Sequence, residues 1–162
     1  MADEQIGAVL TSIANNGANS VQILGQILEV LANTGTIAAT GAITSSSPTA
    51  GIAYATGAGG TVTQATSKST GVTLNKVTGQ ITMNNAALAA GAEVTFTVTN
   101  SAVTPADVPH AVHASGGTAG SYNINVNSVA AGSFAITVSN LSGGSLSEAI
   151  VLNYVILRGA TA

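Results

Sequence analysis

The sequence contains no cysteine and no tryptophan, and charged side chains make up only 6% of its residues. The absence of cysteine excludes disulfides, thiolate chemistry and cysteine-ligated zinc sites. Three basic and six acidic residues are the whole formal charge of a 162-residue chain, whereas about 25% of the residues of an average soluble domain are charged. The surface must therefore be hydrated mainly by Thr, Ser, Asn and Gln.

The shortage of charge also excludes classes of partner. The net charge is -3, and Lys68, Lys76 and Arg158 are too few to form a basic groove for phosphates, so we predict no nucleic-acid partner. A weakly charged surface gives a free monomer little self-repulsion. We interpret the composition as that of a protein that works packed against other subunits.

Groups that could perform chemistry are equally scarce. From Gly60 onward the carboxylates are Glu93, Asp107 and Glu148, which leaves little charge to tune a general acid or base. No glycine cluster is followed by the Lys and helix that a phosphate-binding loop needs. We therefore predict no enzymatic activity and no cofactor, with an enzyme acting on the cell envelope as the weakest alternative.

Residues 1–33 have a helical pattern, because their apolar residues recur in steps of three and four. The turn signal at 15–20 predicts either one broken helix or two short ones, the second starting at Val21. Asp3 and Glu4 stand where a secretory signal peptide would carry basic residues, so we do not expect such a signal here. The residues that we expect at an oligomer interface in this part are Ile6, Ile13, Val21, Ile23, Leu24, Ile27, Leu28 and Leu31.

The second predicted helix is apolar on more than one side, and a helix of about 13 residues is not stable alone in water. It either packs on the β domain of its own chain or forms a bundle with two other copies, since mixed Ile and Leu at core positions favour trimers. Glu29 argues against a membrane span, because a central carboxylate costs about 2.5–3.5 kcal/mol on insertion. Residues 34–59, rich in Gly, Ala, Ser and Thr, predict an extended arm.

From residue 60 the apolar period becomes two, which predicts β-strands. Alternation is clearest at 93–99, 122–127 and 133–139, with shorter strands near 60–64, 71–75 and 79–84, one at 107–113 and a long one at 148–157. About eight short strands separated by turn signals favour a mainly β fold, an antiparallel β-sandwich or jelly roll over 60–162.

The last of these strands is apolar on both faces. Ile150, Leu152, Tyr154 and Ile156 form one face, and the opposite face should be polar in a lone sandwich. That opposite face is instead apolar and is broken only by an asparagine. We predict that another subunit covers Val151, Val155 and Leu157.

Two local patterns leave alternatives open. The segment 89–100 (AAGAEVTFTVTN) resembles 130–140 (AAGSFAITVSN), either by duplication or because two threonine-rich strands look alike. Asp107, His110 and His113 are spaced as in a metal site, but on a strand the two histidines point to opposite faces and cannot chelate one ion within a chain. Only a trimer axis with three copies of one histidine would hold a metal, so we predict none.

Four segments together resemble the C-terminal β domain of bacteriophage head decoration (cement) and head-fibre proteins: GTVTQATSKSTGVTLNKVTGQITM, AALAAGAEVTFTVTNS, ASGGTAGSYNINVNSVAAGSFAITVSNLSGGSLSEA and IVLNYVI. The resemblance covers about three fifths of the chain and implies a sandwich that assembles as a homotrimer on the outside of a virion. The chain departs from the family pattern at PADVPHAVHASGG, where Pro109 and the two histidines put strand pairing in doubt.

The resemblance implies a structural virion protein, made in the host cytoplasm, that binds the major capsid protein on the capsid surface. The alternative is a head-fibre or tail-fibre tip that binds host-surface glycans. Tyr54, Tyr122 and Tyr154 are the only tyrosines available to stack on sugars, which disfavours that alternative. The capsid-binding residues are not predicted.

Overall fold

The computed structural model of the protein describes residues 42, 44, 46–49 and 51–160. The chain divides into two units, Met1–Ile52 and Ala53–Ala162, and the second is the β unit considered below. The predicted helices of residues 1–33 lie outside the described residues, as do residues 34–41, 43, 45 and 50 of the predicted arm. The same holds for the predicted interface residues Ile6, Ile13, Val21, Ile23, Leu24, Ile27, Leu28 and Leu31.

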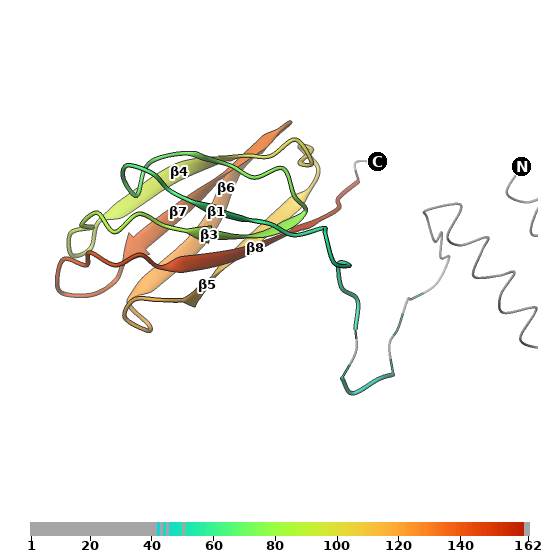
Figure 1. Ribbon diagram of the computed structural model, residues 1–162, viewed down its shortest axis with the longest axis horizontal. Coiled ribbons are helices and arrows are strands. Elements are labelled where there is room, and N and C mark those ends of the chain that lie inside the picture. Colours follow the sequence, from blue (N-terminus) through green and yellow to red (C-terminus); the bar gives the residue numbers. More distant parts are fainter. Residues whose placement is uncertain (1–41, 43, 45, 50, 161–162) are drawn as a thin grey trace, which may run out of the picture. The chain divides into compact units, whose positions relative to one another are not determined.

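The β unit consists of eight strands in two four-stranded sheets (Figure 1). Sheet A has the order β1-β3-β8-β5 and sheet B the order β2-β4-β7-β6. The mainly β, sandwich-like fold and the number of strands are confirmed, and the described residues include no helix. The strands are β1 (Thr61–Thr63), β2 (Val72–Thr73), β3 (Thr78–Thr82), β4 (Glu93–Thr99), β5 (Val108–Ser115), β6 (Tyr122–Ala130), β7 (Ser133–Asn140) and β8 (Val151–Leu157).

The core forms from the apolar positions of the alternating strands. In β7 the residues Phe134, Ile136 and Val138 are fully buried, and from sheet A the residues of β8 with even numbers join the same cluster. Each such side chain contributes about 1.5–3 kcal/mol by leaving water. The period of two in the sequence therefore decides which face of each strand turns inward.

Two strand pairings at the sheet edges are parallel, which the prediction of an antiparallel fold did not include. β1 pairs with β3 and β2 pairs with β4 in parallel, whereas the other four pairings are antiparallel. The reason is that β1, β2, β3 and β4 alternate between the sheets. Each connection from one sheet to the other reverses the direction of the chain. Two successive connections therefore bring the chain back to the first sheet in a strand parallel to the one where it started.

The two similar segments of the sequence occupy corresponding places in the fold. They contain β4 and β7, which pair antiparallel along their whole length. Gly91 and Gly132 have φ angles of 68° and 79°, which glycine adopts without steric cost. The Gly91 N–H donates to the Asn140 carbonyl at 3.0 Å, and the Asn100 N–H donates to the Gly132 carbonyl at 2.8 Å. A hydrogen bond between one of these glycines and one of these asparagines therefore lies at each end of the central strand pair, with donor and acceptor exchanged between the two ends.

Both segments end in a fully buried asparagine. The Asn140 amide donates to the carbonyls of Leu88, Ala89 and Gly144, and its oxygen accepts from Ser142. The sequence Asn140-Leu141-Ser142 has the pattern of a glycosylation site, but these contacts show that it closes a loop. Buried amide groups need such partners, because an unpaired one costs about 1–3 kcal/mol.

The second buried amide connects the two sheets. Asn100 Nδ2 donates to the Lys76 carbonyl at 2.7 Å and to the Tyr154 hydroxyl at 3.3 Å. The Tyr154 hydroxyl donates in turn to main-chain carbonyls of Leu74 and Lys76. Burial raises the pKa of Tyr154 to about 12, so this phenol keeps its proton at neutral pH.

Strand β5 forms although Pro109 lies within it, contrary to the doubt raised by the sequence. Pro109 is paired with Ile156, whose N–H donates to the Val77 carbonyl on the opposite side of β8. The Pro109–Ile156 pair is therefore a pair without hydrogen bonds on the β5 side. The missing N–H of Pro109 faces the open edge of sheet A, so the ladder loses no bond there.

We predict that Gly79→Ala destabilises the β unit by about 1–3 kcal/mol. A Cβ at Gly79 would lie 2.6 Å from Leu74 Cδ2 and 2.7 Å from Tyr154 Cε1, and the hydrogen bonds of Tyr154 prevent its ring from moving away. Gly143→Ala is the control, because a Cβ there has no heavy atom within 4 Å. Urea unfolding measures the difference, and equal stability of the two variants would contradict the packing described for Gly79.

Candidate interaction surface

The outer face of sheet A contains the outward apolar residues of β8 that the sequence pattern anticipated. We define it by the outward side chains of β5 and β8: Val108, His110, Val112, Val151, Asn153, Val155 and Leu157. Val108 is paired with Leu157, His110 with Val155 and Val112 with Asn153, so these side chains lie in adjacent rows. Val108, Leu157 and Val112 are 59%, 56% and 45% exposed.

The predicted residues of β8 lie on this face. Leu157 is exposed, Val151 and Val155 are half-buried, and the residues between them turn into the core. Their cover by another subunit stays a prediction. The sequence pattern did not single out Val108 and Val112 of β5, because prolines and histidines interrupt the apolar residues of this segment. The signal that could have found them is their alternation with the buried Pro109 and Ala111.

The outer face of sheet B is polar. Exposed threonines of β4 lie beside threonine and serine of β7 and asparagines of β6. Thr137 Oγ1 forms hydrogen bonds with Thr95 Oγ1 at 2.8 Å and with Asn127 Nδ2 at 2.8 Å, and Ser139 donates to Glu93 at 2.8 Å. The two outer faces of the β unit therefore differ in chemistry, and only that of sheet A is apolar.

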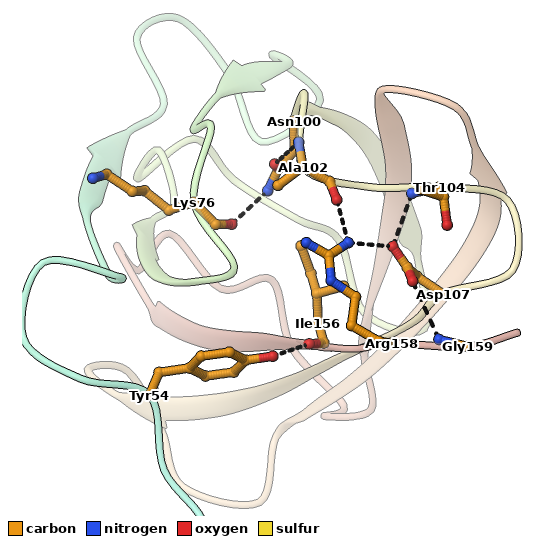
Figure 2. A network of polar contacts seen from close by, with 9 residues as sticks. All are labelled: Tyr54, Lys76, Asn100, Ala102, Thr104, Asp107, Ile156, Arg158 and Gly159. Atoms are coloured by element: carbon orange, nitrogen blue, oxygen red, sulfur yellow. Dashed lines mark hydrogen bonds and ion pairs between the residues drawn. The ribbon is translucent and has the colours of Figure 1, made fainter. Parts of the chain in front are cut away.

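At one end of the β unit, Asp107 and Arg158 form an ion pair of 2.8 Å (Figure 2). The Arg158 guanidinium lies between the Asp107 carboxylate and the Ala102 carbonyl. The Thr104 N–H donates to the same carboxylate at 2.8 Å. This backbone hydrogen bond, together with that from the Gly159 N–H and the Arg158 contact, lowers the pKa of Asp107 below its usual value.

At the other end, Lys68 and Glu148 connect three loops. The buried Lys68 ammonium donates to the main-chain carbonyls of Asn84 at 2.7 Å and Glu148 at 2.5 Å. Burial lowers the pKa of Lys68, an effect that the Glu148 charge opposes. The Glu148 carboxylate accepts from the Thr118 hydroxyl at 2.7 Å and the Tyr122 hydroxyl at 2.7 Å, and these bonds lower its pKa.

The titratable groups named in the sequence do not converge on one site. Asp107 binds Arg158, His110 lies on the outer face of sheet A, and His113 lies on the opposite side of β5 with its ring 5.6 Å from that of Tyr122. The prediction that the two histidines point to opposite faces is confirmed. In the described part of the chain no three His, Asp or Glu side chains are grouped as a metal site would require.

Comparisons of the chain with protein-family models, with curated proteins and with solved structures found no match. Among residues 42–160, where they are described, no helix has the length and hydropathy to cross a membrane.

We predict that Val155→Asp weakens self-association of the full chain at least about tenfold, because a carboxylate buried between subunits without a partner is costly. Thr97→Asp is the matched control, since Thr97 is an outward residue of β4 on the polar face of sheet B. Sedimentation velocity measures both variants. An unchanged sedimentation coefficient for Val155→Asp would count against an interface on sheet A.

We predict that Asp107 contributes stability that is present above pH 4 and is lost as the pH falls further. The folded protein holds the pKa of Asp107 below its ordinary value of 3.8, so the unfolded chain takes up the proton first and acid favours unfolding. Asp107→Asn should lower stability at pH 7 and flatten the fall between about pH 4 and pH 2. Urea unfolding at several pH values tests this, and parallel curves for the two proteins would refute it.

Proposed function

We propose that the protein is a structural virion protein: a homotrimeric decoration, or cement, protein that binds the outside of a bacteriophage head. The resemblance of residues 60–156 to the β domain of that family carries the proposal. The sandwich-like fold of the same segment supports it, because the family's domain is a sandwich. The apolar outer face of sheet A supports the oligomer, since surfaces of this kind mark sites of protein association.

The mechanism is binding rather than chemistry. A protein that binds the assembled shell and not its free subunits stabilises the shell by mass action. Each apolar side chain buried between copies contributes about 1.5–3 kcal/mol, so a few residues per subunit can hold a trimer. The partners are two further copies of this chain and the major capsid protein, with the N-terminal segment and the arm as the proposed attachment to the capsid.

The carboxylates of the β unit support a structural role. Glu93 accepts from Ser139, Asp107 binds Arg158, and Glu148 accepts from Thr118 and Tyr122. Each carboxylate thus holds neighbouring chain segments together. A general acid or base instead needs a pKa near the working pH and access to substrate, whereas the pKa values of Asp107 and Glu148 are lowered.

A second candidate function is a fibre tip that binds host-surface glycans. The outer face of sheet B favours it, because its Thr, Ser and Asn side chains offer the donors and acceptors that sugar hydroxyls need. The number of copies on a particle separates the two functions: hundreds of copies indicate a cement protein and a handful indicate a fibre. Binding on a glycan array above background would favour the second candidate.

We predict that removal of residues 2–33 abolishes attachment to phage heads while the β unit still folds, because the core of this unit lies within residues 72–156. Co-sedimentation of the truncated and full-length proteins with heads that lack them measures attachment, and circular dichroism checks the fold. Normal decoration by the truncated protein would show that the N-terminal segment is not the attachment.

A further inference from the structure

We propose that the open edge of β6 binds residues 34–44 of a neighbouring copy of this chain, which pair with it as an additional strand of sheet B. The proposal rests on the homotrimer of the proposed function and adds a contact that joins its subunits. It assigns this part of the arm to the neighbouring copy and leaves residues 1–33 as the attachment to the head.

Of the edge strands of the two described sheets, β6 is the one that is both long and unobstructed. β1 and β2 have only three and two residues, and β5 contains Pro109 and a register shift between His113 and Ser115. β6 has nine residues without proline or charge, and its register shift lies beyond Asn127. Shortness, proline, bulges and charge are the features that prevent an edge from pairing with another chain. The stretch Tyr122–Asn127 is therefore open to strand addition.

The main chain of β6 directs hydrogen-bonding groups to this open edge. The Asn140 N–H donates to the Ala92 carbonyl at 2.9 Å, on the β4 side of β7, so the pair of Asn140 with Tyr122 has no hydrogen bonds between β7 and β6. The pattern alternates along an antiparallel pair, and Ile124 and Val126 are likewise without such bonds to β7. The N–H and C=O groups of these three residues therefore point away from β7, at the spacing that an added strand requires.

The side chains of β6 also show that sheet B is incompletely covered at this edge. Ile124 and Val126 face the core but are only half-buried, whereas their partners on β7, Val138 and Ile136, are fully buried. Apolar side chains of an added strand would shield them from water. On the outer face the asparagines of β6 are exposed. A matching strand is therefore apolar on one side and polar without charge on the other.

Residues 34–44 have this pattern. In the sequence TGTIAATGAIT, threonine occupies positions 34, 36, 40 and 44, and Ile37, Ala39 and Ile43 lie at the alternating positions. The segment carries no charge, and β4 of the same sheet is formed from a similar alternation of threonine with apolar residues. Residues 1–33 do not fit the edge, because apolar residues in steps of three and four do not stay on one side of a strand.

The described part of the segment indicates that the occupant comes from a second copy. Ala42 and Thr44 are exposed and belong to no strand of their own chain. Residues 45–53, which precede the hydrogen bond of the Tyr54 hydroxyl to the Ile156 carbonyl at 2.5 Å, can span about 30 Å when extended. Each copy would then provide one arm and receive another, a head-to-tail contact that closes in a ring of three.

Disulfide cross-linking of the full-length protein tests the proposal, because the native chain contains no cysteine. Asn125→Cys and Thr40→Cys are placed in separate chains, co-expressed and oxidised mildly. Asn125 lies at a position without hydrogen bonds to an added strand, where opposed Cα atoms are about 4.5 Å apart, which suits a disulfide. Thr36→Cys and Thr44→Cys are combined with Asn125→Cys in the same way. At least one of the three arm cysteines should link the two chains.

Two matched controls separate pairing from random collision. Ala39→Cys lies on the apolar side of the proposed strand, and Thr97→Cys replaces an outward residue of β4, which is paired with β7 away from the open edge. Neither Ala39→Cys with Asn125→Cys nor Thr97→Cys with the arm cysteines should cross-link. The linked product at the best threonine position should exceed both controls at least about tenfold, because a segment bound beside β6 has a high effective concentration.

A proline variant tests the main-chain contact. Ile124→Pro removes an N–H that points to the open edge, so the hydrogen bonds between β6 and β7 are retained. In a chain that also carries Asn125→Cys it should abolish the cross-link to the arm, while circular dichroism checks that the β unit folds. An undiminished cross-link in the folded variant would refute strand pairing. If the variant does not fold, the cysteine pairs alone decide.

Three results would overturn the proposal: no link from any arm threonine to Asn125→Cys, equal linkage of Ala39→Cys, or a link that forms only when both cysteines are in one chain. The last result would assign the edge to the arm of the same chain. Decoration of heads by the native protein tests the proposed function separately. Cross-linked chains together with undecorated heads would refute only that function.

Discussion

Two neutral side chains, the amides of Asn100 and Asn140, hold the ends of the central strand pair β4 and β7. Each is fully buried and bonds main-chain groups of loops that are distant in sequence. Without these amides the loop carbonyls would be buried and unpaired, which is unfavourable. In a chain with so little charge, amides perform the connecting role that ion pairs perform in other proteins, and they do so without the desolvation cost of an ion.

The few ionised groups of the β unit are used in the same way. The Lys68 ammonium bonds carbonyls of two loops, and Asp107 with Arg158 fixes the chain after β8 to the loop before β5. These contacts lie at the two ends of the sandwich, where loops leave carbonyls and amides without strand partners. The strands themselves are stabilised by apolar burial between the sheets.

The sequence predicted the eight strands because the period of two is a local property that burial preserves. It could not predict that β1 pairs in parallel with β3 and β2 with β4. These pairings depend on which sheet each strand joins. The apolar outer face was found through β8, where Val151 and Val155 broke the expected alternation. Its β5 half was missed, and the role of Asn140 could not be read from a three-residue pattern that has another common meaning.

The burial of Lys68 affects where a protease can cleave the folded protein. Trypsin cleaves after Lys and Arg, and the chain contains three such residues. Lys68 is 3% exposed, and cleavage after Arg158 removes only the last four residues. The Lys76 ammonium donates a hydrogen bond to the Gly57 carbonyl at 3.0 Å. Digestion of the β unit by trypsin therefore depends on local opening around two lysines, and cleavage after Lys68 reports the unfolding of the loops that enclose it.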